Sequence, residues 1–454
     1  MQVFKRHVSA RGMTVFGFEI LLISTSLMVA ERLAGPIDDP EVPARILFAT
    51  GLCLLCLYYN DFYDLTLVHS SRELIIRLLQ AAGAATIILA VSSLVAPSLT
   101  IGAGEFLPTL AIVLVGILVW RLVFIAVAET RPLVENVLIV GTSPAARAVA
   151  HQLVAQHDYA YRLVGFVDDA AVEPTASPAL VIGGSKDIGA LVARHDLSRI
   201  VVGVSDRRGR LPMGELLHAK LAGVRVEDAT DMYERLTGKI LLDDLKPSWL
   251  IFSDGFHVSR LQRAGKRGVD VVLSVVGLVL AAPLIALTAL AVWLESGAPV
   301  LYRQERVGQQ NRTFTLFKFR SMRVDAEGDT PIWARQQDDR VTRVGRFIRL
   351  TRLDELPQLW NVLSGDMSFV GPRPERPYFV EQLAEQIPFY HERHAVKPGV
   401  TGWAQVKYRY GASVEDAMEK LRYDLYYIKH MSLVFDLTIV FDTVKVVLFG
   451  KGAH

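Results

Sequence analysis

Four long apolar runs in the first third of the sequence constrain the fold more than any other feature. A helix needs about 20 residues, most of them apolar, to cross the hydrocarbon core of a membrane. The 454-residue sequence has runs of roughly this length at 14–34, 44–60, 75–96 and 106–128. These runs predict a bundle of four membrane-spanning helices within residues 1–130. The hydrophobic share of 51% is high for a soluble protein and agrees with this prediction.

Basic residues beside these runs indicate which side of the membrane the chain occupies. Lys5, Arg6 and Arg11 precede the first run, and Arg131 follows the fourth. Short basic flanks stay on the cytoplasmic side of a membrane. We therefore expect a cytoplasmic N-terminus and a multi-pass protein whose chain returns to the cytoplasm after four crossings. The formal net charge of the whole chain is only +2, so nucleic-acid binding is not expected.

Two charged residues, Glu19 and Arg121, lie within or at the edge of the apolar runs. A charged residue at such a position can mark a functional site, but it can also pair with another helix or extend toward the membrane interface. We favour pairing or interfacial placement for both residues.

Residues 131–255 have a different character. Segments such as ENVLIVGTSPAARAVAHQLVAQ alternate between strand-like and helix-like patterns, which predicts a parallel α/β sheet. The first turn is a degenerate form of the Gly-x-Gly-x-x-Gly phosphate-binding sequence, because Ser143 replaces the second glycine and Pro144 lacks an amide donor. We expect a degenerate Rossmann-like domain on the cytoplasmic side, and a structural or regulatory role is favoured over nucleotide binding.

The run from Val271 to Leu294 contains no charged residue and is long enough to form a fifth span. Pro283 lies in the middle of the run, where it removes one helical hydrogen bond. Basic residues flank both ends, so a spanning helix would leave one basic cluster on the outer side. We expect a re-entrant helix over about 269–295 that breaks at Pro283 and returns to the cytoplasmic side. A kinked span is the alternative.

The stretch at 432–450 is also apolar, but three charges interrupt it: Asp436, Asp442 and Lys445. This pattern favours a helix at the membrane interface over a span.

An arginine row leads directly into a pair of carboxylates. Arginines occur at every third position from 340 to 352, and Asp354 and Glu355 follow at once. Most of this row is expected to form a solvated helix near lipid phosphates. Arg349 and Arg352, which are nearest the acids, are better placed to bind a phosphorylated ligand, because a guanidinium binds phosphate oxygens in pairs.

The acid pair has a structural interpretation and a chemical one. Acidic residues followed by Pro357 are common at the start of a helix. Among cations, however, a carboxylate stays ionised and can attack phosphorus to form an acyl phosphate. Mg²⁺ is typically bound by one or two carboxylates together with substrate phosphates. The arginine row favours the chemical interpretation, with Asp354 and Glu355 as catalytic residues and Mg²⁺ ligands.

Three motifs in this part of the chain resemble one known family. They are FKFRSM at 317–322, RLDELPQLWNVLSGDMSFVGPRPE at 352–375 and KPGVTGWAQV at 397–406. Together they resemble the bacterial sugar transferases known as monotopic phosphoglycosyl transferases, over roughly 260–450. The four upstream helices and the degenerate nucleotide-binding-like domain are similar to the layout of the large members of that family.

The resemblance implies roles for single residues. Asp354 matches the nucleophile that attacks the β-phosphorus of a UDP-sugar, and Glu355 matches its partner acid. Further matches, together with the last arginines of the row, provide the residues expected to bind substrate. These are Lys318, Arg320, Arg349, Arg352, Arg373 and Arg409. Pro283 matches the proline that breaks the membrane helix. The sequence Lys407-Tyr408-Arg409 departs from the Asn-Gly-Arg usual in the family, so the role of Arg409 depends on a different local backbone.

The resemblance also implies a fold class, an activity and partners. The expected fold is a membrane α-helical bundle, an α/β Rossmann-like domain and an α/β monotopic catalytic domain over 260–454. The expected protein resides in the bacterial inner membrane, forms a homodimer and uses Mg²⁺. It transfers a sugar phosphate from a UDP-sugar to undecaprenyl phosphate. A non-catalytic scaffold of polysaccharide assembly and a membrane nucleotide-sugar dehydratase are the alternatives, although the dehydratase would require an intact glycine sequence and a Tyr-x-x-x-Lys pair.

Overall fold

The computed structural model describes residues 10–34, 40–63, 71–96, 103–128, 134–155, 161–169, 181–204, 211–242, 253, 255–256, 258–323, 339–408, 411 and 413–449. Contacts divide the chain into two compact units, Met1–Leu236 and Thr237–His454. The division expected from the sequence, 1–130, 131–255 and 260–454, is not decided by these units and stays a prediction.

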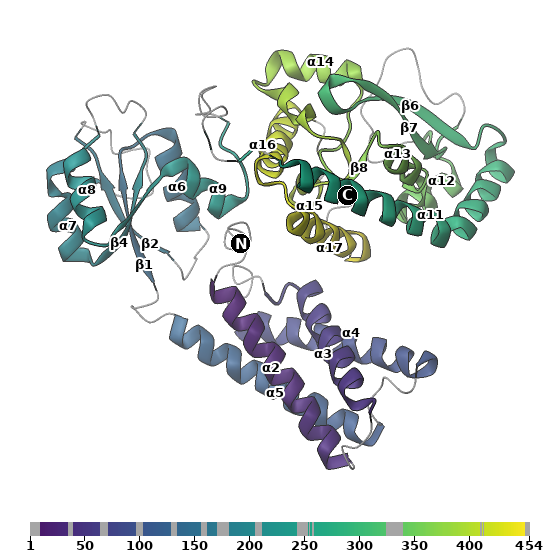
Figure 1. Cartoon of the computed structure of the whole chain (residues 1–454), viewed down its shortest axis with the longest axis horizontal. Coiled ribbons are helices and arrows are strands. Elements are labelled where there is room, and N and C mark those ends of the chain that lie inside the picture. Colours follow the sequence, from purple (N-terminus) through teal and green to yellow (C-terminus); the bar gives the residue numbers. More distant parts are fainter. Residues whose placement is uncertain are drawn as a thin grey trace. The chain divides into compact units, whose positions relative to one another are not determined.

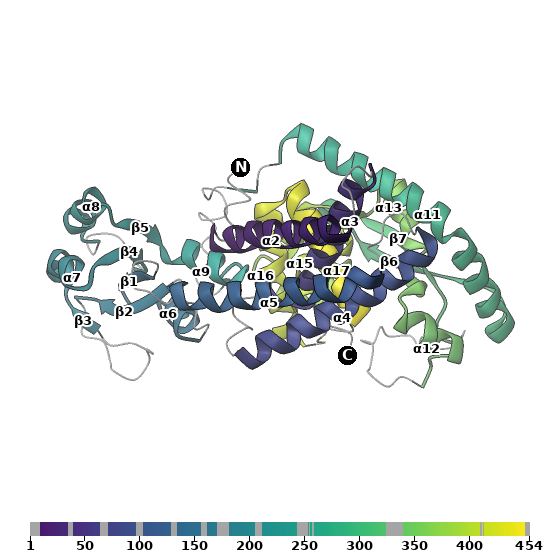
Figure 2. The same ribbon diagram turned by 90° about the horizontal axis from the view of Figure 1, so that it is seen from below.

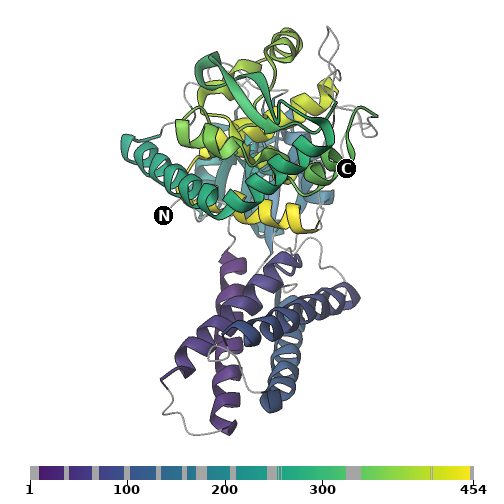
Figure 3. The same ribbon diagram turned by 90° about the vertical axis from the view of Figure 1, so that its right-hand side faces the viewer.

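The first unit contains the four predicted membrane helices. They are α2 (Ala10–Ala34), α3 (Val42–Tyr59), α4 (Ser71–Val95) and α5 (Ala103–Ala128). Each contains a segment long and apolar enough to cross a membrane. Helix α2 packs against α3 and α5, and α4 also contacts both α3 and α5 (Figure 3). Small and branched apolar side chains such as Ile23, Ala49 and Ala81 fill the space between the helices.

The two charges expected within the membrane region are paired. Arg121 Nε on α5 donates to Glu19 Oε1 on α2 over 2.8 Å, and both side chains are buried. The Arg121 guanidinium carbon also lies 4.4 Å from the centroid of the Phe62 ring. The pair therefore links two helices that are distant in the sequence.

A five-stranded sheet follows the membrane helices. Its strands are β1 (Glu135–Val140), β2 (Tyr161–Val167), β3 (Val181–Gly183), β4 (Leu197–Val202) and β5 (Arg225–Asp228). They are all parallel and their order is β3-β2-β1-β4-β5, which is the order of a doubly wound α/β fold. The helices that connect strands are α6 (Pro144–Ala155), α7 (Ile188–His195) and α8 (Met213–Leu221), and α9 (Ala229–Thr237) follows the last strand. Figure 1 shows α7 and α8 on one side of the sheet and α6 on the other.

The turn after β1 already uses the amides that would face a pyrophosphate. Gly141 has a positive φ of 89°. The Ser143 N–H donates to the Gly203 carbonyl over 3.2 Å, the Ala146 N–H donates to Ser143 Oγ over 3.2 Å, and Pro144 has no N–H. These contacts give Ser143 a structural role as the cap of α6, while nucleotide binding by this domain stays untested.

The second unit begins with the long helix α11 (Arg260–Ser296). It starts earlier than the expected 269 because Ser259 and Gln262 form a capping box. The helix does not end at Pro283 but continues to Ser296. It changes direction along its length (Figures 1, 2 and 3), as expected when a proline removes one hydrogen bond and its ring displaces the preceding turn. By length and composition this helix is a fifth candidate for crossing a membrane.

Two short sheets carry the motifs of the second unit. Strands β6 (Leu301–Val307) and β7 (Thr313–Phe319) form an antiparallel hairpin closed by η5 (Gln309–Asn311). Strands β8 (Ser368–Val370) and β9 (Gly399–Thr401) form a parallel pair. The helices around them are α12 (Arg343–Leu350), η6 (Leu353–Glu355), α13 (Gln358–Ser364), α14 (Pro377–Gln386), η7 (Tyr390–Ala395), α15 (Trp403–Lys407), α16 (Val414–His430) and α17 (Leu433–Phe449).

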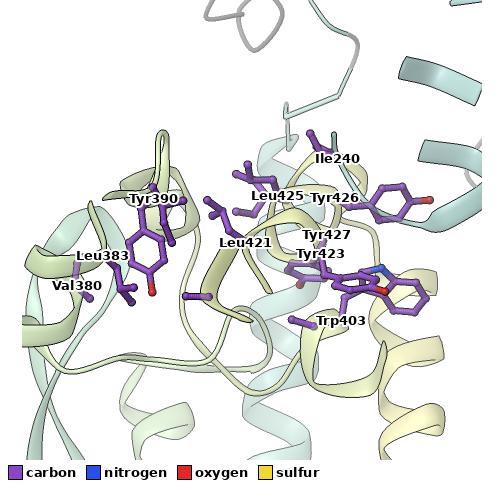
Figure 4. Packing of buried hydrophobic residues seen from close by; sticks show 14 of the residues in the cluster. Ile240, Val380, Leu383, Tyr390, Trp403, Leu421, Tyr423, Leu425, Tyr426 and Tyr427 are labelled. Atoms are coloured by element: carbon purple, nitrogen blue, oxygen red, sulfur yellow. The ribbon is translucent and has the colours of Figure 1, made fainter. Parts of the chain in front are cut away.

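An aromatic core holds the C-terminal helices of this unit together. Trp403 on α15 stacks on Tyr426 of α16, with ring centroids 6.3 Å apart, and meets the Phe435 ring of α17 edge-on at 5.0 Å. Figure 4 shows Trp403 beside the labelled tyrosines of α16. Ile240 is buried in the same core, which places the segment just after Thr237 in the second unit.

Helix α17 has one buried face and one exposed face. Phe435 and Ile439 are buried in the core, whereas Leu437 and Phe441 are exposed. This two-sided character suits the interfacial helix expected from the sequence.

The Glu19–Arg121 pair gives a test of the membrane bundle. Arg121→Met leaves the Glu19 carboxylate buried without its cation, which costs about 3–5 kcal/mol in buried pairs. We expect a clearly lower melting temperature of the protein in detergent. The double variant Glu19→Leu/Arg121→Met removes both charges and should recover most of the loss. A double variant no more stable than Arg121→Met alone would contradict a stabilising role for the pairing.

Candidate active site

The acid pair lies on a single short turn between two helices. Helix α12 ends at Leu350, Arg352 adopts a left-handed conformation with a φ of 59°, and η6 carries Asp354 and Glu355. The flanking Leu353 and Leu356 pack against the cluster formed by Val292, Phe319 and Ile348. These apolar anchors fix the turn on α11 and β7, so the two acids are held in place.

Glu355 is the meeting point of three cations. Its Oε1 lies 3.0 Å from Lys318 Nζ, 3.1 Å from Arg373 Nη2 and 3.9 Å from Arg352 Nη1. Burial alone would raise the pKa of Glu355, but the charges of Lys318, Arg373 and Arg352 lower that pKa well below its usual range. Glu355 is therefore ionised throughout the physiological pH range.

Asp354 has a different environment from its neighbour. Its side chain is buried, and within the described part of the chain its Oδ1 has no hydrogen-bond partner. Burial raises the pKa of Asp354, and the negative charge of Glu355 raises it further, whereas Lys318, Arg349 and Arg352 act in the opposite direction. One carboxylate thus binds the surrounding cations, and the other keeps an oxygen available for chemistry.

Lys318 comes from β7 and is the second residue of the FKFRSM motif. Burial lowers the pKa of Lys318, while the charge of Glu355 opposes that change. The two residues sit on separate elements and their contact at 3.0 Å connects β7 with η6.

Arg320, two residues after Lys318, contacts the C-terminal end of helix α11. Its Nη2 donates to the Ser296 carbonyl over 2.7 Å and to the Gly297 carbonyl over 2.7 Å. These carbonyls at the C-terminus of α11 carry partial negative charge, which suits a guanidinium. This anchoring role was not foreseen from the sequence, and substrate binding by Arg320 stays a prediction.

Arg349 is linked to the same motif. Its Nε donates to Ser321 Oγ over 2.7 Å. A Cβ atom at Gly345 would lie only 2.0 Å from the Ser321 carbonyl oxygen, so a glycine is required for α12 to approach the motif this closely. The close approach brings Arg349 near enough to Asp354 to influence its pKa.

Arg373 lies on the loop that follows β8, and this loop is built jointly with the KPGVTG motif. The Gly371 N–H donates to the Thr401 carbonyl, and the Gly399 N–H donates to the Pro372 carbonyl, both over 2.9 Å. A Cβ atom at Gly399 would lie 2.2 Å from the Gly371 nitrogen. The two motifs therefore form one backbone unit, which explains why glycines occur in both.

The structure brings five of the predicted site residues into one cluster: Lys318, Arg352, Asp354, Glu355 and Arg373. Arg349 borders this cluster, Arg320 lies at the end of α11, and Pro283 lies within α11. Arg409 lies outside the described residues.

Sequence reasoning missed the buried charges behind the cluster. Arg393 and Asp424 form an ion pair at 2.8 Å, and both side chains are almost completely buried. Two histidines, His391 and His394, flank this arginine in the sequence. Their Nδ1 atoms lie 3.3 Å and 2.6 Å from Asn311 Oδ1. No sequence signal marks this burial, because Glu392 and His394 stand directly beside Arg393.

The residues around Asp354 could supply only part of the ligands of a metal ion, so substrate and water would have to supply the others. Within the described ranges, no cluster of three or more His, Cys, Asp or Glu side chains could hold a metal ion. The unpartnered Oδ1 of Asp354 can supply one oxygen ligand, whereas Oε1 of Glu355 is bound by Lys318 and Arg373. Mg²⁺ commonly takes one or two carboxylates and completes its shell with water and substrate phosphates.

Comparison with known proteins agrees with the motifs. The family described as bacterial sugar transferase matches residues 261–450. "UDP-N-acetylgalactosamine-undecaprenyl-phosphate N-acetylgalactosaminephosphotransferase" of Aeromonas hydrophila is 44% identical over 239 residues, which are 53% of this chain and 56% of that protein. This chain thus spans little more than half of that relative's length.

Two further relatives match different shares of the chain. "UDP-glucose:undecaprenyl-phosphate glucose-1-phosphate transferase" of Xanthomonas campestris pv. campestris is 28% identical over 482 residues, covering 100% of this chain and 97% of that protein. "Exopolysaccharide production protein PSS" of Rhizobium leguminosarum bv. phaseoli is 40% identical over 197 residues, which are 41% of this chain and 97% of that protein. The second of these is covered almost completely at 40% identity, which is enough to show the family. The chain belongs to the bacterial sugar transferase family.

Proposed function

We propose that the protein transfers a sugar 1-phosphate from a UDP-sugar to undecaprenyl phosphate, with release of UMP. The reaction would start assembly of the repeat unit of an exopolysaccharide, capsule or O-antigen. The observation that carries the proposal is the buried, unpartnered carboxylate oxygen of Asp354 beside three cations held by Glu355. The names of the relatives from Aeromonas and Xanthomonas, which include undecaprenyl phosphate as acceptor, support it.

In the first step, an oxygen of the ionised Asp354 attacks the β-phosphorus of the UDP-sugar. A bond forms between this oxygen and phosphorus, and the bond from the β-phosphorus to the bridging oxygen breaks. The bridging oxygen leaves with its electron pair as part of UMP. The sugar phosphate stays bound to Asp354 as an acyl phosphate, a good acceptor for a second nucleophile.

In the second step, a phosphate oxygen of undecaprenyl phosphate attacks the same phosphorus. The bond to Asp354 breaks, and the carboxylate is regenerated. The product is undecaprenyl diphosphate sugar. Because Asp354 takes part as an ionised group in both steps, no proton has to be added to it or removed from it during the cycle.

The cations around Glu355 provide the electrostatic environment for this transfer. Lys318, Arg352 and Arg373 come within 4 Å of one carboxylate oxygen, so their charges are already concentrated before a substrate binds. Preorganised charges stabilise the negative charge that builds on phosphoryl oxygens at low reorganisation cost. Glu355 in this proposal positions these cations and keeps them from repelling one another.

Asp354 would contribute one oxygen to a Mg²⁺ ion whose other ligands are substrate phosphates and water, and a contribution from Glu355 stays a prediction. When bound, the ion would offset charge on the diphosphate.

Both ends of α11 bind other elements of the second unit, which supports a re-entrant membrane helix. Near its start, Arg267 Nη1 donates to the Val362 carbonyl over 2.6 Å. At its end, the Glu295 carboxylate accepts from the Arg343 N–H over 2.9 Å. A straight helix between these positions would be about 42 Å long, more than the roughly 30 Å of a hydrocarbon core. If α11 crossed the membrane, its two ends would lie on opposite sides, although both bind the same folded unit.

The apolar side chains along α11 supply the membrane contact in this proposal. Val272, Val279, Leu280 and Leu287 are all more than half exposed. Immersed in one leaflet, they would carry the catalytic cluster to the cytoplasmic surface of the inner membrane. There the phosphate of a very apolar acceptor could reach Asp354 without leaving the lipid phase.

Asp354→Asn tests the assigned nucleophile. The amide is nearly isosteric but cannot form the acyl phosphate, so release of UMP from UDP-sugars should fall at least about 1,000-fold. Purified protein with Mg²⁺, undecaprenyl phosphate and a panel of UDP-sugars provides the assay. Asp366→Asn is the matched control, because Asp366 is exposed and hydrogen-bonds only to nearby Ser364 among the contacts described. Unchanged turnover by Asp354→Asn would exclude the mechanism.

Removal of divalent cations tests the metal. Because the diphosphate charge would then be offset by the protein's cations alone, we expect EDTA to suppress UMP release and added Mg²⁺ to restore it. The melting temperature should hardly change on chelation, since the proposed ion is held mainly through substrate. Full activity after chelation would rule out the metal requirement.

Cysteine labelling tests the course of α11. The background is a variant whose Cys53 and Cys56 are replaced by serine. In it, a single cysteine at Ala264 probes the start of α11, and one at Thr313 probes the segment beyond its end. A re-entrant helix predicts that an impermeant maleimide labels neither position in intact spheroplasts and both after permeabilisation. Glu41→Cys, expected outside, is the positive control. Labelling at position 313 alone in intact spheroplasts would show that α11 crosses the membrane.

A further inference from the structure

We propose that Arg393 and Arg306 are positioning residues that hold the loop carrying Arg373 in place for phosphate transfer. The inference rests on the proposed function, because Arg373 is assigned there to the diphosphate of the substrate. Neither arginine contacts Glu355 or Asp354 among the described interactions. Each binds a main-chain carbonyl of the loop instead.

The loop has few means of holding itself. Its sequence, Gly371-Pro372-Arg373-Pro374, contains two prolines, which have no N–H to donate. Their rings restrict φ, but the remaining torsions still allow the segment to move as a body. Apart from the Gly371 N–H, which donates to the Thr401 carbonyl, the loop is held mainly by donors from other elements that bind its carbonyl oxygens.

Four successive carbonyls of the segment each accept such a bond. The Pro372 and Glu375 carbonyls accept from the backbone N–H groups of Gly399 and Val307, both over 2.9 Å. The two carbonyls between them accept from side chains. Arg393 Nη2 donates to the Arg373 carbonyl over 3.0 Å, and Arg306 Nη1 donates to the Pro374 carbonyl over 2.9 Å.

Arg393 is itself held in place by two residues outside the loop. Its Nε donates to Asp424 Oδ2 over 3.1 Å, and its Nη1 donates to the Tyr390 hydroxyl over 2.8 Å. Arg393 is 4% exposed and Asp424 is 2% exposed. A planar guanidinium bound to a buried carboxylate and a buried phenol has a defined orientation. Its remaining donor therefore reaches the Arg373 carbonyl from a fixed point in the core.

The position of this backbone decides where the Arg373 side chain can reach. Arg373 Nη2 contacts Glu355 Oε1 at 3.1 Å, although the side chain is 36% exposed. A surface arginine on a mobile loop would lose much of its freedom on binding a diphosphate, and a misplacement of about 1 Å can reduce a rate about 100-fold. Arg393 and Arg306 remove this cost in advance.

Arg393→Lys is the most informative change. Lysine keeps a cation beside Asp424, so the fold should survive, but a single ammonium cannot reach Asp424, Tyr390 and the Arg373 carbonyl together. We expect kcat/KM for UMP release to fall about 10- to 100-fold. Arg306→Lys should have a smaller effect in the same direction. Arg422→Lys, an arginine paired with Glu419 on α16, is the matched control and should behave like the wild type.

A double-mutant cycle with Arg373→Ala separates positioning from general stability. If Arg393 acts through Arg373, adding Arg393→Lys to Arg373→Ala should reduce the remaining rate by less than about twofold. An equal loss in both backgrounds would overturn the inference, as would a single Arg393→Lys variant with full activity. If the wild type releases no UMP from any UDP-sugar tested, the proposed function fails and the inference fails with it.

Hydrogen exchange provides a readout that does not depend on residual activity. In Arg393→Lys, amide exchange within 368–376 should accelerate, while exchange within α16, which carries Asp424, stays close to that of the wild type. Acceleration throughout the unit would point to a structural role, and an unchanged rate within 368–376 would contradict the inference. If Arg393→Lys fails to fold, the same cycle and exchange measurement with Arg306→Lys decide the question.

Discussion

Glu355 holds together three parts of the second unit that are separated in the sequence. Lys318 comes from β7, Arg352 from the turn before η6 and Arg373 from the loop after β8, and all three approach one carboxylate oxygen. Without that negative charge the three cations would repel one another across a few ångströms. The arrangement leaves the adjacent Asp354 buried, near positive charge and without a hydrogen-bond partner for Oδ1 among the described residues. A phosphoryl group is the ligand that such a site suits best.

The surrounding fold holds the elements that carry these residues in fixed positions relative to one another. The aromatic core of α15, α16 and α17 supports the β8–β9 pair, and Lys266 of α11 contacts the Val370 carbonyl and the Asp436 carboxylate. Arg320 and Glu295 fix the other end of α11 to β7 and α12. Helix α11 and the elements around the Glu355 cluster are thus connected at two places. If α11 lies in the membrane as proposed, its depth in the lipid would set the height of Asp354 above it.

The sequence predicted those features that depend on local pattern. Apolar runs of sufficient length predicted α2 to α5, and strand-helix alternation predicted the parallel sheet. Asp354 and Glu355 were found because a carboxylate pair after an arginine row suits phosphate chemistry, whereas Lys318 and Arg373 were assigned through the resemblance to the family. The structure brings all four together. Burial of charge cannot be read from one sequence, so Arg393 and Asp424 were not singled out before the structure showed them buried. Arg320 was assigned to substrate, whereas its described bonds cap α11, since a guanidinium suits a phosphate and a helix C-terminus equally well.

The most direct test of the central claim is to trap the covalent intermediate. Purified protein would be incubated with Mg²⁺ and a UDP-sugar that supports UMP release, without undecaprenyl phosphate, and then quenched and digested. Mass spectrometry should find one sugar phosphate on the peptide containing Asp354, assigned to that residue by fragmentation, and the adduct should disappear when undecaprenyl phosphate is added before quenching. An adduct on another residue, or transfer to the acceptor with no adduct at any time, would contradict the mechanism.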